Sequence, residues 1–149
     1  MQLADALAKL LRLDAAISDA LGNEVADEAR TAVKEAAESV VYSYEPQFYS
    51  RRKENGGLTD DANIKTTVSG NVLTVEDVAG LQNLWGGTHT EPLTPIITAG
   101  LPNYNMPYPR PFMDEAAALL KNGRAEDALL RGLRRQGFSG AGTGNVTVD

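Results

Sequence analysis

The one histidine of the chain, His89, is the side chain whose type could most readily support chemistry. It lies in the segment Gly86-Gly87-Thr88-His89-Thr90-Glu91. A neutral imidazole is a common metal ligand, and a small hydrolase could combine it with carboxylates. The carboxylates that could join it are those of Asp60, Asp61, Asp77 and Glu91. No pair among them has a recognised ligand spacing, so a metal-dependent hydrolase is the alternative hypothesis, and a surface or hydrogen-bonding histidine is the main one.

Other patterns that would indicate catalysis or phosphate binding are incomplete. The serines lack a G-x-S-x-G nucleophile elbow, and one histidine permits only a single triad geometry. The run from Gly140 to Gly144 lacks the Lys-Ser/Thr pair and the following helix of a phosphate loop. We therefore predict that the chain is not an enzyme and expect no catalytic residue, metal or cofactor.

Amino-acid composition further narrows the class of protein to which the chain can belong. The chain has 149 residues, enough for one domain with its own core, and a net charge of -6, which disfavours nucleic-acid binding as the default. It has no cysteine, which excludes disulfides and thiolate metal sites. No stretch approaches the roughly 20 apolar residues of a membrane span. Charged residues from Asp5 to Asp14 interrupt the N-terminus, so no signal peptide is expected.

A basic triplet, Arg51-Arg52-Lys53, follows the aromatic-rich segment from Tyr42 to Tyr49. Aromatic and basic side chains together can bind single-stranded nucleic acid. In an acidic protein the better interpretation is aromatic core anchors beside surface charge. A weaker alternative is that the triplet contacts a host factor.

Helical periodicity is clearest before residue 45. Leu3, Leu7, Leu10 and Leu11 fall at helical spacing, and Asp14 could cap a second short piece. Gly22 is a natural helix stop and Asn23 a natural cap. A long amphipathic helix is then expected from about Glu24 to Tyr42.

Later elements are marked by turn residues. Alternation over Ile64–Val68, the turn Ser69-Gly70-Asn71 and the return from Val72 to Val78 predict a β-hairpin. From 86 to 110 no sustained period appears, and six of the seven prolines lie between Pro92 and Pro111; Ile96-Ile97 could add a short strand. Pro111 then opens a helix, Asn122-Gly123 ends it, and a last helix runs from about Arg124 to Arg135.

These elements predict an α+β fold, with N-terminal helices and a long amphipathic helix packed on a small antiparallel sheet, followed by two C-terminal helices. We expect a single domain over 1–138, in which the long proline-rich loop 86–110 is an assembly insert. Residues 139–149 are expected to form an extended, flexible tail, whose Val146-Thr147-Val148 could add a strand to a partner's sheet.

In this order the elements resemble the tail-completion, or head–tail joining, proteins of long-tailed bacteriophages. The matching features are the amphipathic helix, the segment ENGGLTDDANIKTTVSGNVLTV, Leu84-Trp85-Gly86-Gly87-Thr88, and Pro109-Arg110-Pro111-Phe112-Met113 opening a helix. The resemblance covers about Glu24 to Lys121. It departs where Trp85-Gly86 replaces the usual acidic residue before Gly-Thr, and in the long insert after Thr88.

The resemblance implies a structural virion protein at the neck or upper tail, assembled in the host cytoplasm. It would form a homo-oligomeric ring, expected to be a hexamer, between connector, neck and tail proteins, with DNA passing through without sequence-specific binding. Phe112 is expected to fold back on its own subunit. Expected partner contacts are Trp85, His89, Ile96, Ile97, Tyr104, Met106, Tyr108, Arg110, Val146 and Val148.

Overall fold

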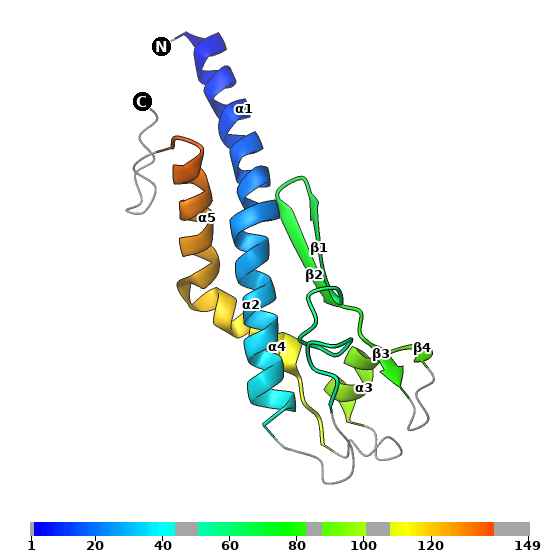
Figure 1. The fold of residues 1–149 in the computed structure, drawn as a ribbon. Helices are drawn as coiled ribbons and strands as arrows, with labels where there is room; N and C mark the ends of the chain where they lie inside the picture. The colour runs from blue at the N-terminus through cyan, green and yellow to red at the C-terminus, as the bar shows by residue number, and fades with distance from the viewer. Residues whose placement is uncertain (1, 44–50, 83–87, 101–107, 139–149) are drawn as a thin grey trace. The chain divides into compact units, whose positions relative to one another are not determined.

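The computed structural model describes residues 2–43, 51–82, 88–100 and 108–138, and for 81, 82 and 88–91 the backbone alone. Its helices and small antiparallel sheets make an α+β fold, as predicted (Figure 1). In chain order the elements are α1 (Leu3–Ala20), η1 (Leu21–Val25), α2 (Ala26–Ala36), η2 (Ala37–Val41), β1 (Ile64–Ser69), β2 (Val72–Asp77), β3 (Gly80–Gln82), β4 (Thr88–Pro92), α3 (Leu93–Ala99), α4 (Phe112–Leu119), η4 (Leu120–Arg124) and α5 (Ala125–Arg135).

The chain forms two compact units. The first gathers described residues from 1–29, 66–74 and 120–149, and the second gathers those from 30–65 and 75–119. Each unit draws on segments that are far apart in the sequence, so neither is a contiguous stretch. The single domain ending at 138 stays a prediction.

The N-terminal helix does not stop at Gly22. The segments α1, η1, α2 and η2 follow one another directly, so the backbone is helical from Leu3 to Val41. The predicted stop at Gly22 and the predicted caps at Asp14 and Asn23 are therefore wrong. The Asn23 side-chain amide donates to the Asp19 main-chain carbonyl at 2.8 Å. In a regular α-helix the Asn23 N–H would bind that carbonyl, and the helix instead widens into the π-helical turn η1 and continues.

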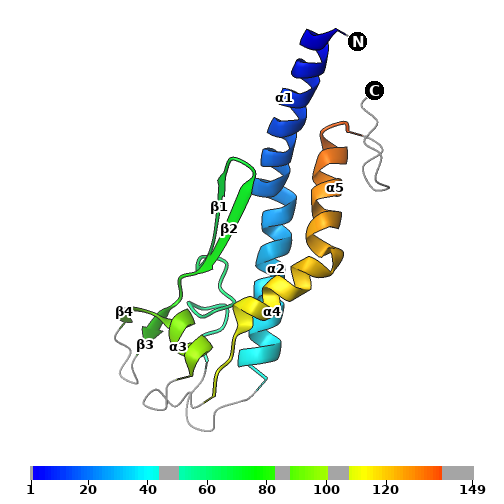
Figure 2. The same ribbon diagram turned by 180° about the vertical axis from the view of Figure 1, so that it is seen from behind.

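In the first unit, α5 and the β1–β2 hairpin lie beside α1 and η1. The two strands pair as predicted, and Gly70 at their turn has a φ of 59°, which glycine adopts without steric cost. The next turn residue, Asn71, donates its side-chain N–H to Asp14 at 2.7 Å. In both ribbon views α5 runs alongside α1 (Figures 1 and 2), and Ala16 and Ala20 of α1 are buried.

In the second unit, the largest fully buried side chains are those of Phe112, Leu58, Ile64 and Val33. Phe112 opens α4, which packs on η2, so the expectation that Phe112 folds back on its own chain is confirmed. The other sheet of the described residues pairs β3 with β4 antiparallel, with an irregularity in register between Gly80 and Gln82.

The region from 86 to 110 is not one long loop. It contains β4 and then α3, and Ile96 and Ile97 lie in this helix, so the short strand expected there is wrong. Pro95 is the third residue of α3, a position whose N–H has no partner inside a helix, so a proline there costs no hydrogen bond. Pro92 and Pro95, which belong to the predicted loop, therefore mark the start of a helix.

The C-terminal helices match the predictions closely. Helix α4 begins at Phe112, directly after Pro111. The backbone leaves helical geometry at Asn122 and Gly123, within η4, and α5 follows to Arg135. The predicted tail, with Val146 and Val148, lies outside the described residues.

Candidate assembly surfaces

Exposed leucines gather on the first turns of α1. Leu3, Leu7, Leu10 and Leu11 are 87%, 56%, 63% and 61% exposed. Positions i, i+4, i+7 and i+8 lie on one face of a helix, and we call this face the leucine stripe. In both ribbon views the first turns of α1 reach beyond the end of α5 and beyond the hairpin turn (Figures 1 and 2). Neither element therefore covers the stripe.

The hairpin covers the same face further along the helix. Asp14 follows Leu7 by two turns and is the residue that Asn71 contacts at the hairpin turn. A Cβ atom on Gly22, two turns beyond, would lie 3.7 Å from a methyl group of Val68. The leucine stripe is thus the uncovered start of a face that is otherwise packed.

A glycine allows α5 to approach α1 and η1. A Cβ atom on Gly132 would lie 2.5 Å from the Cβ of Ala20 and 2.7 Å from Oε2 of Glu24. Real Cβ atoms do not approach so closely, so this packing requires glycine. About one helical turn beyond Gly132, Gln136 donates a side-chain amide N–H to the Ala16 carbonyl at 2.8 Å.

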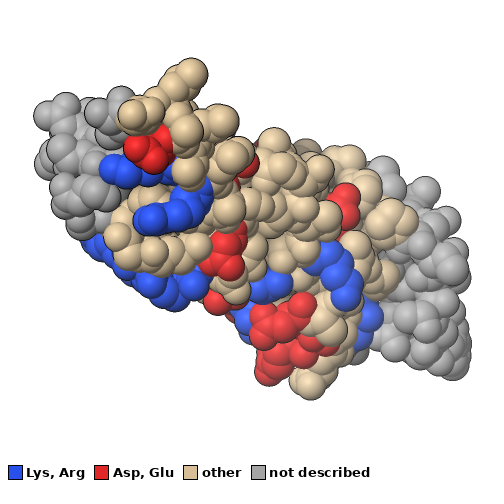
Figure 3. All heavy atoms as spheres, turned by 90° about the horizontal axis from the view of Figure 1, so that it is seen from above, with Lys and Arg blue, Asp and Glu red and all other residues tan. Residues whose placement is uncertain are grey.

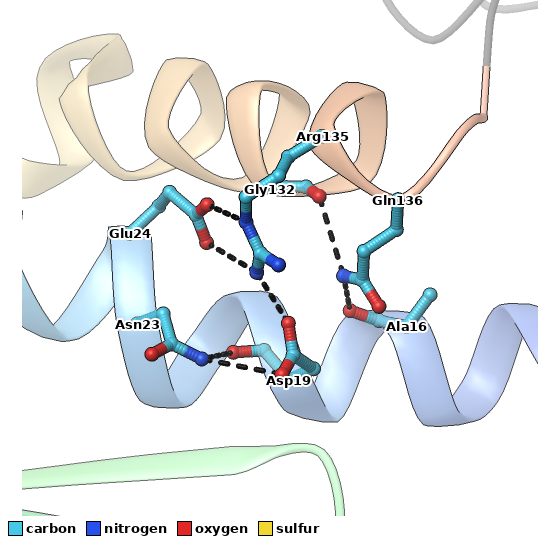
Figure 4. Close-up of polar contacts among 7 residues, drawn as sticks. All are labelled: Ala16, Asp19, Asn23, Glu24, Gly132, Arg135 and Gln136. Carbon is cyan, nitrogen blue, oxygen red and sulfur yellow. Dashed lines mark hydrogen bonds and ion pairs between the residues drawn. The ribbon is translucent and has the colours of Figure 1, made fainter.

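Arg135 links the same helices by charge. Figure 4 shows it reaching from α5 to the carboxylates of both Glu24 and Asp19. Its second hydrogen bond to Glu24 joins an η nitrogen to Oε2 at 3.2 Å. The hydrogen bond from Arg135 lowers the pKa of Glu24, and the two carboxylates raise the pKa of Arg135. These acidic side chains are therefore held by an arginine and serve packing.

A second cluster repeats the arrangement near the start of α5. Arg124 donates to Glu28 at 2.6 Å, and an η nitrogen of Arg131 lies 3.7 Å from the other oxygen of Glu28. Figure 3 shows acidic and basic side chains interspersed with uncharged surface over the face it presents. On the face that Figure 3 shows, charges of both signs therefore do not form the basic stripe that nucleic-acid binding requires.

In the second unit, Gly100 and Tyr108, the described residues on either side of 101–107, lie close together at the end of α3. The amide of Arg110 donates to the Ile97 carbonyl at 3.0 Å. Gly100 has a φ of 69°, and a Cβ on it would lie 2.6 Å from the carbonyl carbon of Tyr108. The chain therefore leaves α3 at Gly100 and returns to the same place at Tyr108, whose side chain is exposed.

The basic triplet packs inside its own unit. The Arg51 guanidinium and the Lys53 ammonium lie 5.2 and 5.4 Å from the centre of the Tyr42 ring. The Tyr42 hydroxyl accepts a hydrogen bond from the Leu58 N–H at 3.1 Å, and burial raises the pKa of Tyr42. Arg52 donates to the Gly80 carbonyl at 2.6 Å. Each basic residue of the triplet thus makes a contact within the chain and is partly buried, whereas the sequence interpretation placed these charges on the surface beside aromatic core anchors.

The predicted partner contacts are not gathered in one place. Ile96 and Ile97 lie in α3 and their side chains are buried, so they pack within their own unit. Tyr108 is exposed and Arg110 partly exposed, both after α3. His89 lies in β4, with only its backbone described. The remaining candidates, outside the described residues, are Trp85, Tyr104, Met106, Val146 and Val148. A contact role for each stays a prediction.

Two of the carboxylates considered for a metal site with His89, those of Asp60 and Asp61, are engaged elsewhere, and the Glu91 side chain lies outside the described part of the chain. Asp60 accepts the Gly56 and Ala62 N–H groups at 2.7 and 2.9 Å. Asp61 forms an ion pair with Lys34 at 2.6 Å. No group of three or more His, Cys, Asp or Glu side chains suited to a metal occurs within the described part of the chain.

Asp77 has a different environment. It is buried at the end of β2, where Oδ1 accepts the Ala79 N–H at 2.9 Å and Oδ2 has no hydrogen-bond partner among the described residues. Burial raises its pKa to about 6. From the sequence, Asp77 is a candidate metal ligand only. Its position at the end of a predicted strand does not indicate that the side chain is buried.

Sequence reasoning identified the spacing of the α1 leucines but not their exposure. It also placed arginines near the end of the last helix without pairing them with Glu24 or Asp19. An acidic row on one helix and a basic row on another are typical of ion-paired neighbours, and that pattern was available in the sequence.

Comparison with known proteins gives one result. The YomN family matches residues 2–135. No curated protein and no solved structure matches the chain. Among the described helices, none is long and apolar enough to cross a membrane. Because the match spans nearly all of its length, the chain belongs to the YomN family, a phage-derived protein family.

Proposed function

We propose that the chain is a structural virion protein, a tail-completion subunit that forms a ring at the neck and joins the head connector to the tail. The leucine stripe carries this proposal. Large apolar side chains exposed together on one helix face mark protein contacts, whereas scattered ones need no explanation. The phage-derived family and the resemblance to tail-completion proteins both support a role in a particle.

The fixed ends of 101–107 support the same role. Hydrogen bonding at Arg110 and the close approach of Gly100 to Tyr108 place the described residues on either side of this segment next to α3. A binding segment whose ends are already positioned loses less conformational freedom when it meets a neighbour. The segment contains Tyr104 and Met106, which are residue types favoured at the centres of interfaces.

The charge of the chain suits a ring through which DNA passes. The net charge is -6, and the arginines of α5 that the structure pairs, Arg131 and Arg135, face carboxylates. Such a surface would not retain phosphates during DNA passage. The proposal therefore includes no sequence-specific nucleic-acid binding and no membrane.

Mass spectrometry of purified particles, with negative-stain microscopy of particles lacking the gene, tests the proposal. We expect the chain in the particles at a fixed copy number, and unjoined heads and tails when it is missing. Incorporation of Leu7→Glu should fall, whereas Ala8→Glu, an exposed change just outside the stripe, should be incorporated normally. Normal particles that lack the chain would reject the proposal.

A further inference from the structure

We propose that the leucine stripe pairs with itself. Two copies of the chain would pack their α1 helices antiparallel through Leu3, Leu7, Leu10 and Leu11. This inference rests on the proposed role of the stripe as an assembly surface and names its first partner, a second copy of the chain.

The lack of charge and the short length of the leucine stripe limit which kind of surface can cover it. Asp5, Lys9 and Arg12 recur at i, i+4 and i+7 on another face of α1, so the stripe carries no charge before Asp14. It is also short. From Leu3 to Leu11 the helix rises about 12 Å, and the hairpin turn then begins at Asp14. The occupant is therefore a short apolar helix face, and the start of α1 in a second copy has this length and chemistry.

Asp14 determines the direction of pairing. In a parallel pair, Asp14 of one copy would face Asp14 of the other beside the leucines, and like charges in that position repel. In an antiparallel pair with Leu7 opposite Leu10 of the second copy, Asp14 lies opposite Leu3, at the start of the second helix. The carboxylate then meets the positive end of a helix.

That helix start has free hydrogen-bonding capacity. Gln2, the N-cap residue of α1, makes no side-chain hydrogen bond to the first turn, so its side chain does not cap the first N–H groups. Asp14 accepts one hydrogen bond, from Asn71 at 2.7 Å, and an ionised carboxylate can accept several. Two equivalent contacts between Asp14 and a helix start would fix the register of the pair.

The pair has two-fold symmetry, so it closes at two copies. The head-to-tail contacts of a ring have different symmetry and must use other surfaces. Because the stripe spans only about three turns, we expect dissociation constants between about 1 and 500 µM. Pairing would cover the leucines in the free chain until a neighbour in the particle replaces the second copy.

Sedimentation velocity of the full chain from about 0.1 to 500 µM tests the pairing. The wild type should change from monomer to dimer over this range. Leu7→Glu should weaken association at least tenfold, and Ala8→Glu, with the same new charge just outside the stripe, should associate as the wild type does. Circular dichroism verifies that both variants remain helical. A wild type that stays monomeric, or Leu7→Glu that dimerises normally, would overturn the proposal.

Disulfide cross-linking tests the direction, because the chain has no cysteine of its own. A mixture of Leu7→Cys and Leu10→Cys chains, whose altered positions lie opposite each other in this register, should form a mixed dimer on oxidation. Leu3→Cys alone should remain uncross-linked, because antiparallel pairing separates the two sites by about 16 Å. Rapid cross-linking of Leu3→Cys alone would show a parallel pair and overturn the proposal. A dimer that is absent from particles would leave the pairing intact and refute the virion role, so the two failures are distinguishable.

Discussion

Gly132 of α5 lies so close to Ala20 of α1 that a Cβ atom on the glycine would come within 2.5 Å of the alanine Cβ. Arg135, less than one turn beyond Gly132, reaches Glu24 and Asp19 on the other side of the contact. The close approach and the charge contacts thus join α5 to the same N-terminal helical segment.

Gly132→Ala should therefore destabilise the chain although alanine is the better helix former. Overpacking of about 1–3 kcal/mol exceeds the gain of up to about 1 kcal/mol in helix propensity. Gly22→Ala is the matched control, since its Cβ would make an ordinary 3.7 Å contact with Val68. It should be neutral or stabilising by up to about 1 kcal/mol. Urea unfolding of both variants measures this, and equal effects would contradict the importance of the close approach.

Arg135→Gln should raise the pKa of Glu24. The hydrogen bond from Arg135 is the largest cause of the lowered value, and the charge of Arg131 is the smallest. Because the folded pKa lies below the unfolded value of 4.5, Glu24 contributes stability above that pH and loses it as the pH falls through the folded pKa. NMR titration of the Glu24 carboxyl carbon should show a larger rise in Arg135→Gln than in Arg131→Gln. The reverse order would contradict the assigned pairing.

Asp77 should make the chain less stable as the pH rises. Its folded pKa of about 6 lies above the unfolded value of 3.8, so folding favours the protonated form. The corresponding stability is fully present below about pH 3.8 and is lost as the pH rises through about 6. At one pKa unit per about 1.36 kcal/mol, the loss at pH 8 is at most about 3 kcal/mol.

Asp77→Asn should remove this loss. The amide oxygen can still accept the Ala79 N–H, and no charge is buried. Urea unfolding should show the variant more stable than the wild type at pH 8 and the difference vanishing at pH 3.5. Asp61→Asn, at an exposed ion pair, should change stability by less than about 1 kcal/mol at either pH. An Asp77→Asn chain that is less stable at pH 8 would mean that the ionised carboxylate has a favourable partner.

Features set by neighbouring residues were predictable from the sequence. Turn residues located the hairpin at Gly70, and Asn122-Gly123 located the break before α5, because a local backbone preference decides both. Gly22 failed as a helix stop because a side-chain hydrogen bond at Asn23 and packing on both sides of the helix outweigh a cost of about 1 kcal/mol.

The candidate surface was predictable only in part. The spacing of the four leucines on α1 is a property of the sequence. Their exposure depends on where α5 and the hairpin turn end in space, which no local pattern reports. Similarly, α3 was missed because its prolines were interpreted as loop residues, while Leu93 and Ile97 are buried as helix residues.

Gly100→Ala should loosen the end of α3 from which residues 101–107 begin. Gly100 combines a φ of 69°, which disfavours any side chain, with a Cβ position 2.6 Å from the Tyr108 carbonyl carbon. We expect a loss of about 2–4 kcal/mol, from backbone strain of about 1–2 kcal/mol together with the forced separation of the two ends. Hydrogen exchange should also speed up at the Arg110 amide, which donates to the Ile97 carbonyl.

Gly137→Ala separates backbone strain from the steric effect of the close approach, the two causes of the loss expected for Gly100→Ala. Gly137 has a φ of 91°, but apart from its chain neighbours no atom of the described residues lies within 4 Å of its Cβ position, so we assign only backbone strain to the change. Its loss should be about 1–2 kcal/mol, with no change in exchange at Arg110. If Gly100→Ala costs no more than Gly137→Ala and leaves that amide protected, the return of the chain to α3 does not depend on the close approach at Gly100. The segment 101–107 would then lack the fixed ends that its proposed role in assembly requires.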